Sequence, residues 1–194
     1  RTLVAELVAG EIARALGLRV PELVFMQLDT DLARSEPDPE IQDLIRASAG
    51  CNLALDYLPG STTFDPVADT IDAATASAIV WFDAYVSNVD RTARNTNMLI
   101  WHRKLWLIDQ GAAFYFHHGE DDFVPRAHDP FARIREHVLL AQAADLAGVD
   151  ATLAARVGDD VIERIVALIP ADWLEARGAT GDAPRQRIAY RDYL

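Results

Sequence analysis

The segment W-F-D-A-Y-V-S-N-V-D-R-T-A-R-N-T-N-M-L-I-W-H-R-K-L-W-L-I-D-Q-G, residues 81–111, decides how the rest of the chain is interpreted. It begins in an apolar helical pattern and enters a polar loop at Asp90 and Arg91, which two short apolar runs follow. Residues 102–104 separate these runs like a turn, so we expect a β-hairpin. Asp109 follows the second run directly. The segment therefore predicts a helix, a polar loop and a hairpin with one carboxylate on either side.

The composition limits the possible folds and partners. The chain has 194 residues and is 51% hydrophobic, so we expect a packed core in one domain or in two small lobes. A net charge of -12, without a basic stripe, argues against nucleic-acid binding and against anionic membranes. The single cysteine, Cys51, excludes an intrachain disulfide framework and is expected to be structural. No signal-peptide or membrane-spanning pattern is present, which favours a cytoplasmic location.

Apolar periodicity and turn residues divide the chain into a mixed first part and a mostly helical second part. Residues 1–16 have the pattern of an amphipathic helix, which Gly17 ends. A boundary is predicted at the turn that follows residue 58, with one domain at 1–58 and another at 59–194. The expected fold class is α+β. Strands are expected at 23–28 and 52–58, and helices at 41–49, 69–87, 131–144, 152–157, 160–168 and 184–194, with a short piece around Trp173.

Asp90 is the strongest candidate for chemistry. It follows a long helix and begins a polar loop before a strand, where its carboxylate could orient or deprotonate an acceptor hydroxyl. The alternative is an Asp that caps a turn or pairs with Arg91. Arg91 and Arg94 could neutralise phosphate or pair with nearby acids, whereas Asp83 and Asn88 are expected to have supporting roles.

Asn95, Asn97 and Asp109 are the candidate ligands for Mg²⁺, because amide and carboxylate oxygens suit this ion. Asn95 has the interval from Asp90 that kinases use, whereas Asn97 directly precedes an apolar strand. We favour Asn97, since the strand fixes where its side chain points, although either Asn could simply form a turn. Asp109, at the exit of the hairpin, is the predicted main metal ligand. Its alternative is an Asp that satisfies a turn.

Two further positions could contact a nucleotide. Glu6 lies on the first helix among apolar residues, where a kinase has a Glu that pairs with the phosphate-holding Lys. Its alternative is an ordinary solvated acid. Asp56, Tyr57 and Leu58 precede the Pro-Gly turn and could form a connector whose backbone reads an adenine edge. Their alternative is an ordinary strand and turn.

These motifs resemble the HipA-like kinase family, in particular its short bacterial members, and share a logic with phosphoinositide and protein kinases. The matching segments are L-V-A-E-L-V-A-G-E-I-A-R-A-L-G-L-R-V-P-E at 3–22, D-Y-L-P-G-S at 56–61, N-V-D-R-T-A-R-N-T-N at 88–97 and L-W-L-I-D-Q-G at 105–111. The resemblance implies a two-lobed, protein-kinase-like fold, ATP and Mg²⁺ as cofactors, and transfer of the γ-phosphoryl group to an unknown protein or small-molecule acceptor. It assigns the catalytic role to Asp90, metal binding to Asp109 with Asn97 or Asn95, and the helix Glu to Glu6.

The chain departs from the family pattern upstream of Glu6. It shows no Gly-rich phosphate loop and no strand Lys there, so we expect a truncated N-lobe and native sequence before Arg1. The alternative function is a non-catalytic nucleotide-binding or interaction module, a pseudokinase. A third possibility, a metal-dependent phosphohydrolase, would need a second carboxylate cluster, for which Asp121 and Asp122 are the candidates. The neighbouring His117 and His118 are interpreted as loop residues.

Overall fold

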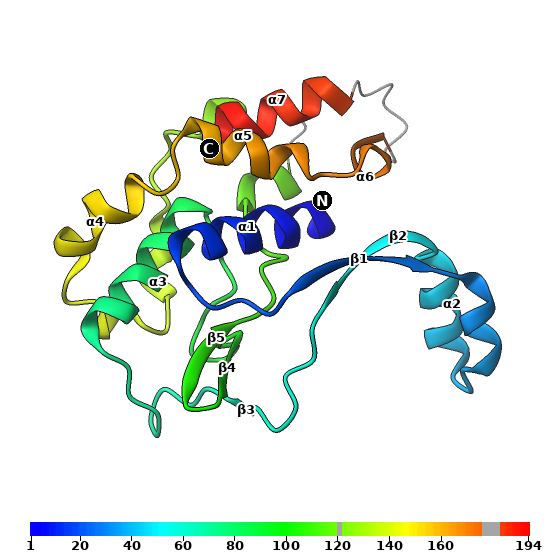
Figure 1. Cartoon of the computed structure of the whole chain (residues 1–194), viewed down its shortest axis with the longest axis horizontal. Helices are drawn as coiled ribbons and strands as arrows, with labels where there is room; N and C mark the ends of the chain where they lie inside the picture. Colours follow the sequence, from blue (N-terminus) through cyan, green and yellow to red (C-terminus); the bar gives the residue numbers. More distant parts are fainter. Residues whose placement is uncertain (120–121, 176–182) are drawn as a thin grey trace. The chain divides into compact units, whose positions relative to one another are not determined.

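The structure is a computed structural model, and it describes residues 1–119, 122–175 and 183–194 (Figure 1). The chain forms two compact units, one made of residues 1–20 and 58–194 and the other of Pro21–Tyr57. The predicted lobes, 1–58 and 59–194, differ from these units because the first helix packs within the larger one. Mixed helices and small antiparallel sheets agree with the predicted α+β class.

The larger unit contains most of the helices and one small sheet. Its elements are α1 (Thr2–Leu16), β3 (Thr62–Thr63), α3 (Ala73–Tyr85), β4 (Met98–Trp101), β5 (Lys104–Leu107), η2 (Tyr115–His118), η3 (Val124–Arg126), η4 (Ala132–Glu136), η5 (Leu140–Gln142), α4 (Leu146–Ala154), α5 (Asp159–Ala167), α6 (Ala171–Glu175) and α7 (Ala183–Tyr193).

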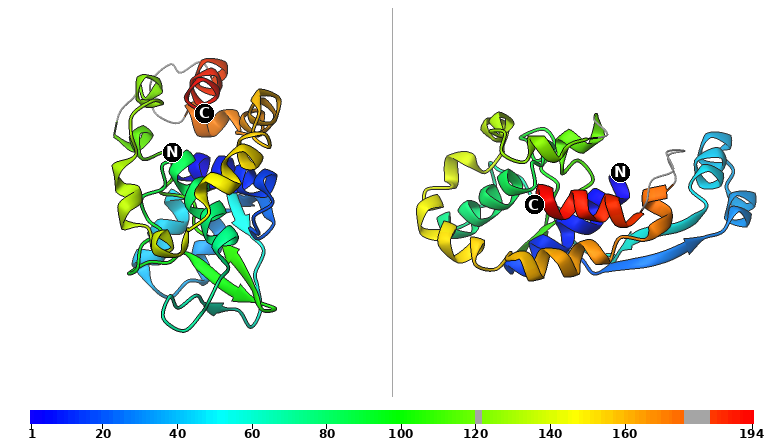
Figure 2. Two further views of the ribbon diagram at one scale, coloured as in Figure 1. Left: turned by 90° about the vertical axis from the view of Figure 1, so that its left-hand side faces the viewer. Right: turned by 90° about the horizontal axis from the view of Figure 1, so that it is seen from above.

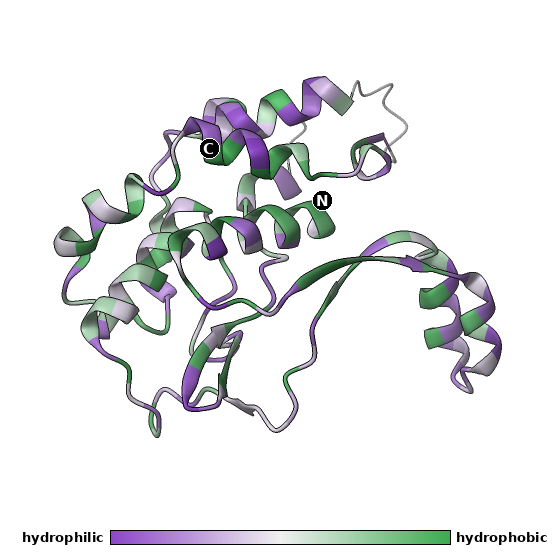
Figure 3. Cartoon of the chain, viewed as in Figure 1, coloured by the Kyte–Doolittle hydropathy of each residue, from purple (hydrophilic) through white to green (hydrophobic). Residues whose placement is uncertain are grey.

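Helix α1 lies in the core of this unit and confirms the helix predicted at 1–16. It is apolar along most of its length (Figure 3), and even Glu6 on this helix is buried. The helix ends at Gly17, whose φ of 85° closes the last turn through N–H bonds to two preceding carbonyls. Glycine suits this left-handed position because it has no Cβ. Helix α5 packs against both α1 and α7, and the second of these pairs is visible in Figures 1 and 2.

The β4–β5 hairpin confirms the hairpin predicted around 102–104, although Lys104 already belongs to β5 and only His102 and Arg103 form the turn. The strands pair antiparallel from Met98 opposite Leu107 to Trp101 opposite Lys104, and β3 pairs with the other edge of β4. The turn residues, His102 and Arg103, have φ values of 48° and 60°, as the right-handed twist of a tight hairpin requires. The open end of the hairpin therefore lies at residues 97 and 108.

Helix α3 leads into the polar loop. It begins after Asp72, whose side chain accepts hydrogen bonds from the Thr75 N–H at 2.8 Å and the Thr75 hydroxyl at 2.7 Å. This cap explains why the helix starts at Ala73 and not at residue 69, as its apolar pattern predicted. The helix buries Phe82 and Asp83 near its end, and the chain leaves it through Ser87, which has a φ of 50°.

The predicted helix at 131–144 is wrong. The segment forms two short 3₁₀ helices, η4 and η5, with extended backbone at His137 between them. His137 makes an isolated β-bridge with Thr92, and the Val138 N–H donates to the Arg91 carbonyl at 3.0 Å. These bonds to the polar loop replace the bonds of a continuous helix, so tertiary structure here overrides the local pattern.

The smaller unit consists of an antiparallel strand pair and short helices. Its elements are β1 (Leu23–Leu28), η1 (Thr30–Ser35), α2 (Pro39–Ala47) and β2 (Gly50–Leu55). Strand β1 confirms the prediction at 23–28, and β2 begins and ends earlier than predicted. Helix α2 begins where Asp38 caps it and Pro39 occupies its first turn. Helix α2 contains both apolar and polar residues (Figure 3), and none of its residues is buried.

None of the described helices combines the length and the apolar character that crossing a membrane requires.

Candidate functional site

A buried carboxylate, Asp83, lies beneath the polar loop. It is fully enclosed and accepts from Arg91 Nε at 2.6 Å, Asn88 Nδ2 at 2.9 Å and His137 Nε2 at 2.8 Å. Burial raises its pKa, but the guanidinium charge and the hydrogen bond from the imidazole outweigh burial, so the pKa lies below its ordinary value. Asp83 is therefore an ionised anchor for the segments that surround it.

His137 is a member of this cluster that the sequence analysis missed. Its Nδ1 accepts the Leu139 N–H at 3.0 Å, so the ring proton lies on Nε2 and is donated to Asp83. No spacing in the sequence singles out this histidine, because it comes from a segment whose apolar pattern suggested a helix. The bridge to Thr92 and the bond to Asp83 together fix the segment beneath the loop.

Arg91 links the loop to the residues that precede and follow the hairpin. Besides its ion pair with Asp83, it donates from Nη1 to the Asn97 carbonyl at 2.5 Å and from Nη2 to Gln110 Oε1 at 2.6 Å. Its side chain is completely buried. Of the two roles predicted for Arg91, the structure shows pairing with a nearby acid. A buried group with these partners positions other residues. The predicted contact of Arg91 with phosphate stays a prediction.

Asp90 is held by both candidate asparagines. Asn95 Nδ2 donates to Asp90 Oδ2 at 2.8 Å, and Asn97 Nδ2 donates to the same oxygen at 3.2 Å. The Asp90 N–H donates to Asn88 Oδ1 at 3.1 Å. Asp90 is thus held by three hydrogen bonds and forms no ion pair with Arg91, which was one of its two alternatives. Because each amide nitrogen faces Asp90, each amide oxygen stays available as an acceptor or ligand.

Asn97 and Asp109 flank the open end of the hairpin. The Ile108 N–H donates to the Asn97 carbonyl at 3.0 Å, which extends the ladder by one bond beyond the last paired residues. Asn97 has a φ of 47° and Asp109 a φ of 54°. Left-handed backbone is uncommon for residues other than glycine but is tolerated best by Asn and Asp. Asn97 is buried whereas Asp109 is exposed.

Glu6 packs against the turn that follows Asp109. Its carboxyl accepts the N–H groups of Gln110 and Gly111, and it is only 8% exposed. Burial is the main reason that its pKa rises to about 7, and the nearby Asp109 charge adds to the effect. Its Oε1 atom has no hydrogen-bond partner among the described residues. Glu6 is therefore not an ordinary solvated acid, which was its alternative.

Gly111 permits the close approach of this turn to α1. A Cβ at this position would lie 2.8 Å from the Thr2 Cγ2 atom and 3.7 Å from Glu6 Oε2. The first of these distances is shorter than real Cβ contacts allow, so a larger residue would require the Thr2 side chain or the turn to shift. The Asp109–Gly111 turn and Glu6 are thus fitted to one another.

The predicted connector is divided between the two compact units. Asp56 and Tyr57 belong to the smaller unit, where the Asp56 N–H donates to the Glu22 carbonyl at 2.9 Å. Tyr57 is 80% exposed, and Leu58, in the larger unit, is buried. Their nucleotide role stays a prediction.

A cavity of about 550 Å³ opens beside the loop. Asn95 and Asn97 line it, together with apolar side chains that include Leu99 and Ile108. This volume is in the range of small-molecule sites. The cavity therefore combines amide groups with an apolar wall next to Asp90.

The donor set fits Mg²⁺ better than a softer metal. Among the described residues, no three His, Cys, Asp or Glu side chains converge as a metal site. The oxygens of Asp109 and the two asparagines are hard ligands, and Mg²⁺ usually takes few protein ligands and completes its shell with phosphate and water. Asp121, one half of the acid pair that a phosphohydrolase would need, lies outside the described residues. His117 is buried and bonds Tyr190 through Nδ1 at 2.8 Å, in η2 and not in an irregular loop.

An Asp in a polar loop, an Asn after it and a later Asp are residue types that kinases also use, in this order along the chain. A sequence model described as HipA-like kinase matches residues 1–189, so the chain belongs to the HipA-like kinase family. Comparison with curated proteins and with solved structures found no significant match.

Proposed function

We propose that the protein is an ATP- and Mg²⁺-dependent phosphotransferase that moves the γ-phosphoryl group of ATP to a hydroxyl of a protein or small molecule. The proposal includes a two-lobed, kinase-like arrangement, a connector at Asp56, Tyr57 and Leu58 that contacts adenine, and a bacterial cytoplasmic location. Family membership and the geometry around Asp90 support it.

The single observation that carries the proposal is the pair of amide groups on Asp90. Asn95 and Asn97 both donate to one oxygen of this carboxylate, so its other oxygen can face an acceptor hydroxyl. A carboxylate positioned in this way can orient the hydroxyl and accept its proton. The Asn97 carbonyl and Gln110 are fixed by the same guanidinium, which ties the loop to the turn at Asp109.

Asp109, with Asn97 or Asn95, would hold Mg²⁺. When bound, the ion would neutralise charge on the β- and γ-phosphates. The chain's own residues would orient the acceptor through Asp90 and provide the apolar wall beside the asparagines. Glu6 would present its unpaired oxygen to a cationic group near the phosphates.

A non-catalytic nucleotide-binding module is the second candidate, and one observation favours it. The sequence contains one lysine, Lys104, which is exposed and lies at the turn end of the hairpin, opposite to Asp109. A lysine partner for Glu6 therefore does not come from these residues. Such a module would bind Mg-ATP without transferring phosphate.

The test compares phosphate transfer and nucleotide binding in the same preparations. Transfer from radiolabelled ATP, to the protein itself or to water, is measured for the wild type, Asp90→Asn and Asp109→Asn, with Asp160→Asn as a control. Asp160 is an exposed acid on α5 that pairs with Arg164. Transfer that is lost in the first two variants and retained in the control supports the phosphotransferase. A thermal shift with Mg-ATP but no transfer supports the module, and no shift and no transfer contradicts both.

A further inference from the structure

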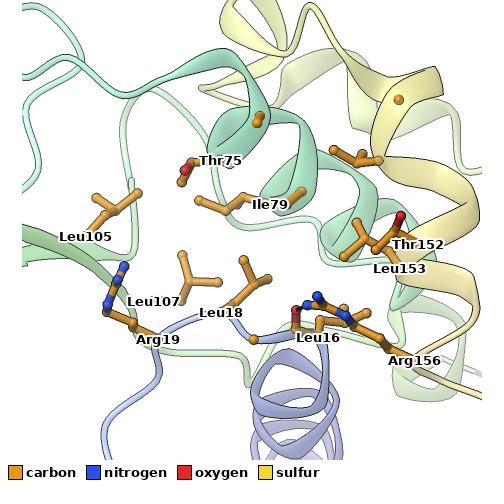
Figure 4. Close-up of a pocket in the computed structure, with 15 residues that line it drawn as sticks. Leu16, Leu18, Arg19, Thr75, Ile79, Leu105, Leu107, Thr152, Leu153 and Arg156 are labelled. Carbon is orange, nitrogen blue, oxygen red and sulfur yellow. Dashed lines mark hydrogen bonds between the residues drawn. The ribbon is translucent and has the colours of Figure 1, made fainter.

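A second cavity, of about 410 Å³, lies on the side of the β4–β5 hairpin where Leu105 and Leu107 point (Figure 4). These two side chains alternate with Trp106, so they lie on the opposite face of β5 from it. The other walls come from the end of α1, from α3 and from α4. The cavity is separate from the one that the asparagines line, because the two share no residue.

Most of the residues that line this cavity are apolar. Leu16, Leu18, Ile79 and Leu153 project toward the space that the two hairpin leucines also border (Figure 4). The α3 wall includes Ala78, whose small side chain leaves room that a larger one would fill. Such a volume with such a lining is typical of sites for small organic ligands.

The charged residues of the cavity are all of one sign. Its described lining includes Arg19 and Arg156 and no acidic residue, although the chain as a whole has a net charge of -12. The Arg19 backbone is held in place, since the Leu107 N–H donates to its carbonyl at 2.8 Å. Within the described part of the chain, the Arg19 guanidinium has no ion pair or hydrogen bond. Arg156 uses Nη1 to donate to the Leu16 carbonyl at 2.5 Å.

We propose that this cavity binds a small amphipathic anion, a molecule with an apolar body and one anionic head group. The apolar walls would bury the body, and its transfer from water would provide most of the affinity. The Arg19 guanidinium would hold a carboxylate or phosphate head. Arg156, which lies across Leu18 and Leu107 from Arg19 in Figure 4, would add to the positive charge around the ligand. Neither catalysis nor Mg-ATP binding is required for this site.

The position of the cavity gives the ligand direct contact with two elements of the candidate active site. Leu16 belongs to α1, the helix that carries Glu6, and Leu107 ends β5 shortly before Asp109. An occupant would therefore touch both elements without approaching the asparagines.

The experiment is isothermal titration of the whole chain with decanoate, below the concentration at which it forms micelles. Decyl phosphate and decanol are titrated in parallel, so that the three probes share their chain and differ in their head. We expect saturable binding of at least one anion, and the tighter of the two identifies the head group. Binding of decanol as tight as that of both anions would overturn the proposal, as would the absence of saturable binding.

Three variants locate the bound probe. Arg19→Gln should weaken anion binding roughly fivefold, as expected for one partly solvated charge contact. Ala78→Leu should weaken binding, because its larger side chain takes up part of the cavity, and its circular dichroism spectrum checks that it folds. Arg14→Gln, on the same helix but outside the lining, is the matched control and should bind like the wild type. Arg19 is exposed, so we expect Arg19→Gln to fold like the wild type. Anion binding by this variant that equals binding by the wild type would refute the site.

Discussion

Arg91 and Asp83 form an ion pair that is completely enclosed, with Nε and Oδ2 2.6 Å apart. The pair joins the end of α3 to the loop that carries Asp90. The same guanidinium also reaches the Asn97 carbonyl and Gln110. One side chain therefore fixes the loop, the entry to β4 and the turn after β5 relative to one another.

We expect Arg91→Met to lower the free energy of unfolding by about 3–5 kcal/mol, because it leaves a buried carboxylate without its cation. Urea denaturation measures this change. Arg94→Met, in the same loop but exposed, should change stability by less than about 0.5 kcal/mol. Equal midpoints for Arg91→Met and the wild type would show that the ion pair contributes nothing to the fold.

The two asparagines should differ in their effect on metal binding. Asn97→Ala is expected to raise the Mg²⁺ concentration needed for half-maximal ATP binding by about tenfold or more, since Asn97 is buried and fixed directly before β4. Asn95→Ala, at an exposed position, should change it by less than about threefold. Fluorescent ATP-analogue titrations at several Mg²⁺ concentrations measure both. The reverse order would assign the ligand to Asn95.

The pattern of the sequence was sufficient for the elements that local physics determines. Helix α1, strand β1 and the β4–β5 hairpin follow from apolar periodicity and turn residues, and they lie where the sequence predicted them. The prediction of a helix at 131–144 was wrong because the backbone of this segment bonds to Arg91 and Thr92, which are far away in the sequence.

The residue types of the candidate site were predictable from the sequence, but the hydrogen-bond and ion-pair partners of these residues were not. Asp90 and the asparagines occur close together in the sequence and are bonded to one another in the structure. The sequence could not show that Arg91 turns inward to Asp83 or that His137 joins the pair, because burial depends on the packed fold. The burial of Glu6 could not be predicted from the sequence either, since Glu side chains are usually solvated.

Phe114 should be essential for attaching α7 to the segment that follows the hairpin. It is fully buried, has a φ of 54°, and its ring contacts Tyr190 and Tyr193 edge-on. We expect Phe114→Ala to lower the free energy of unfolding by about 3–5 kcal/mol and to speed amide exchange in α7. Tyr115→Ala, next to it but 43% exposed, should have a much smaller effect. Retained protection of α7 in Phe114→Ala would contradict this role.

The stability of the chain should fall as the pH rises through the range in which Glu6 is ionised only in the unfolded state. Its folded pKa is about 7 against a model-compound value of 4.5, so the folded protein retains a proton that the unfolded chain releases. The free energy of unfolding therefore decreases from about pH 4.5 to about pH 7 and then levels off, with a total loss of about 3 kcal/mol from this group.

Glu6→Gln removes this titration and keeps an oxygen that can accept from the Gln110 and Gly111 N–H groups. Urea denaturation at a series of pH values should show that the variant loses less stability than the wild type between pH 4.5 and 7. Glu11→Gln, on the same helix at a partly exposed position, should keep the wild-type slope. Parallel curves for Glu6→Gln and the wild type would mean that the Glu6 carboxyl is already ionised in the folded protein below neutral pH, and that burial against the Asp109 turn does not hold its proton.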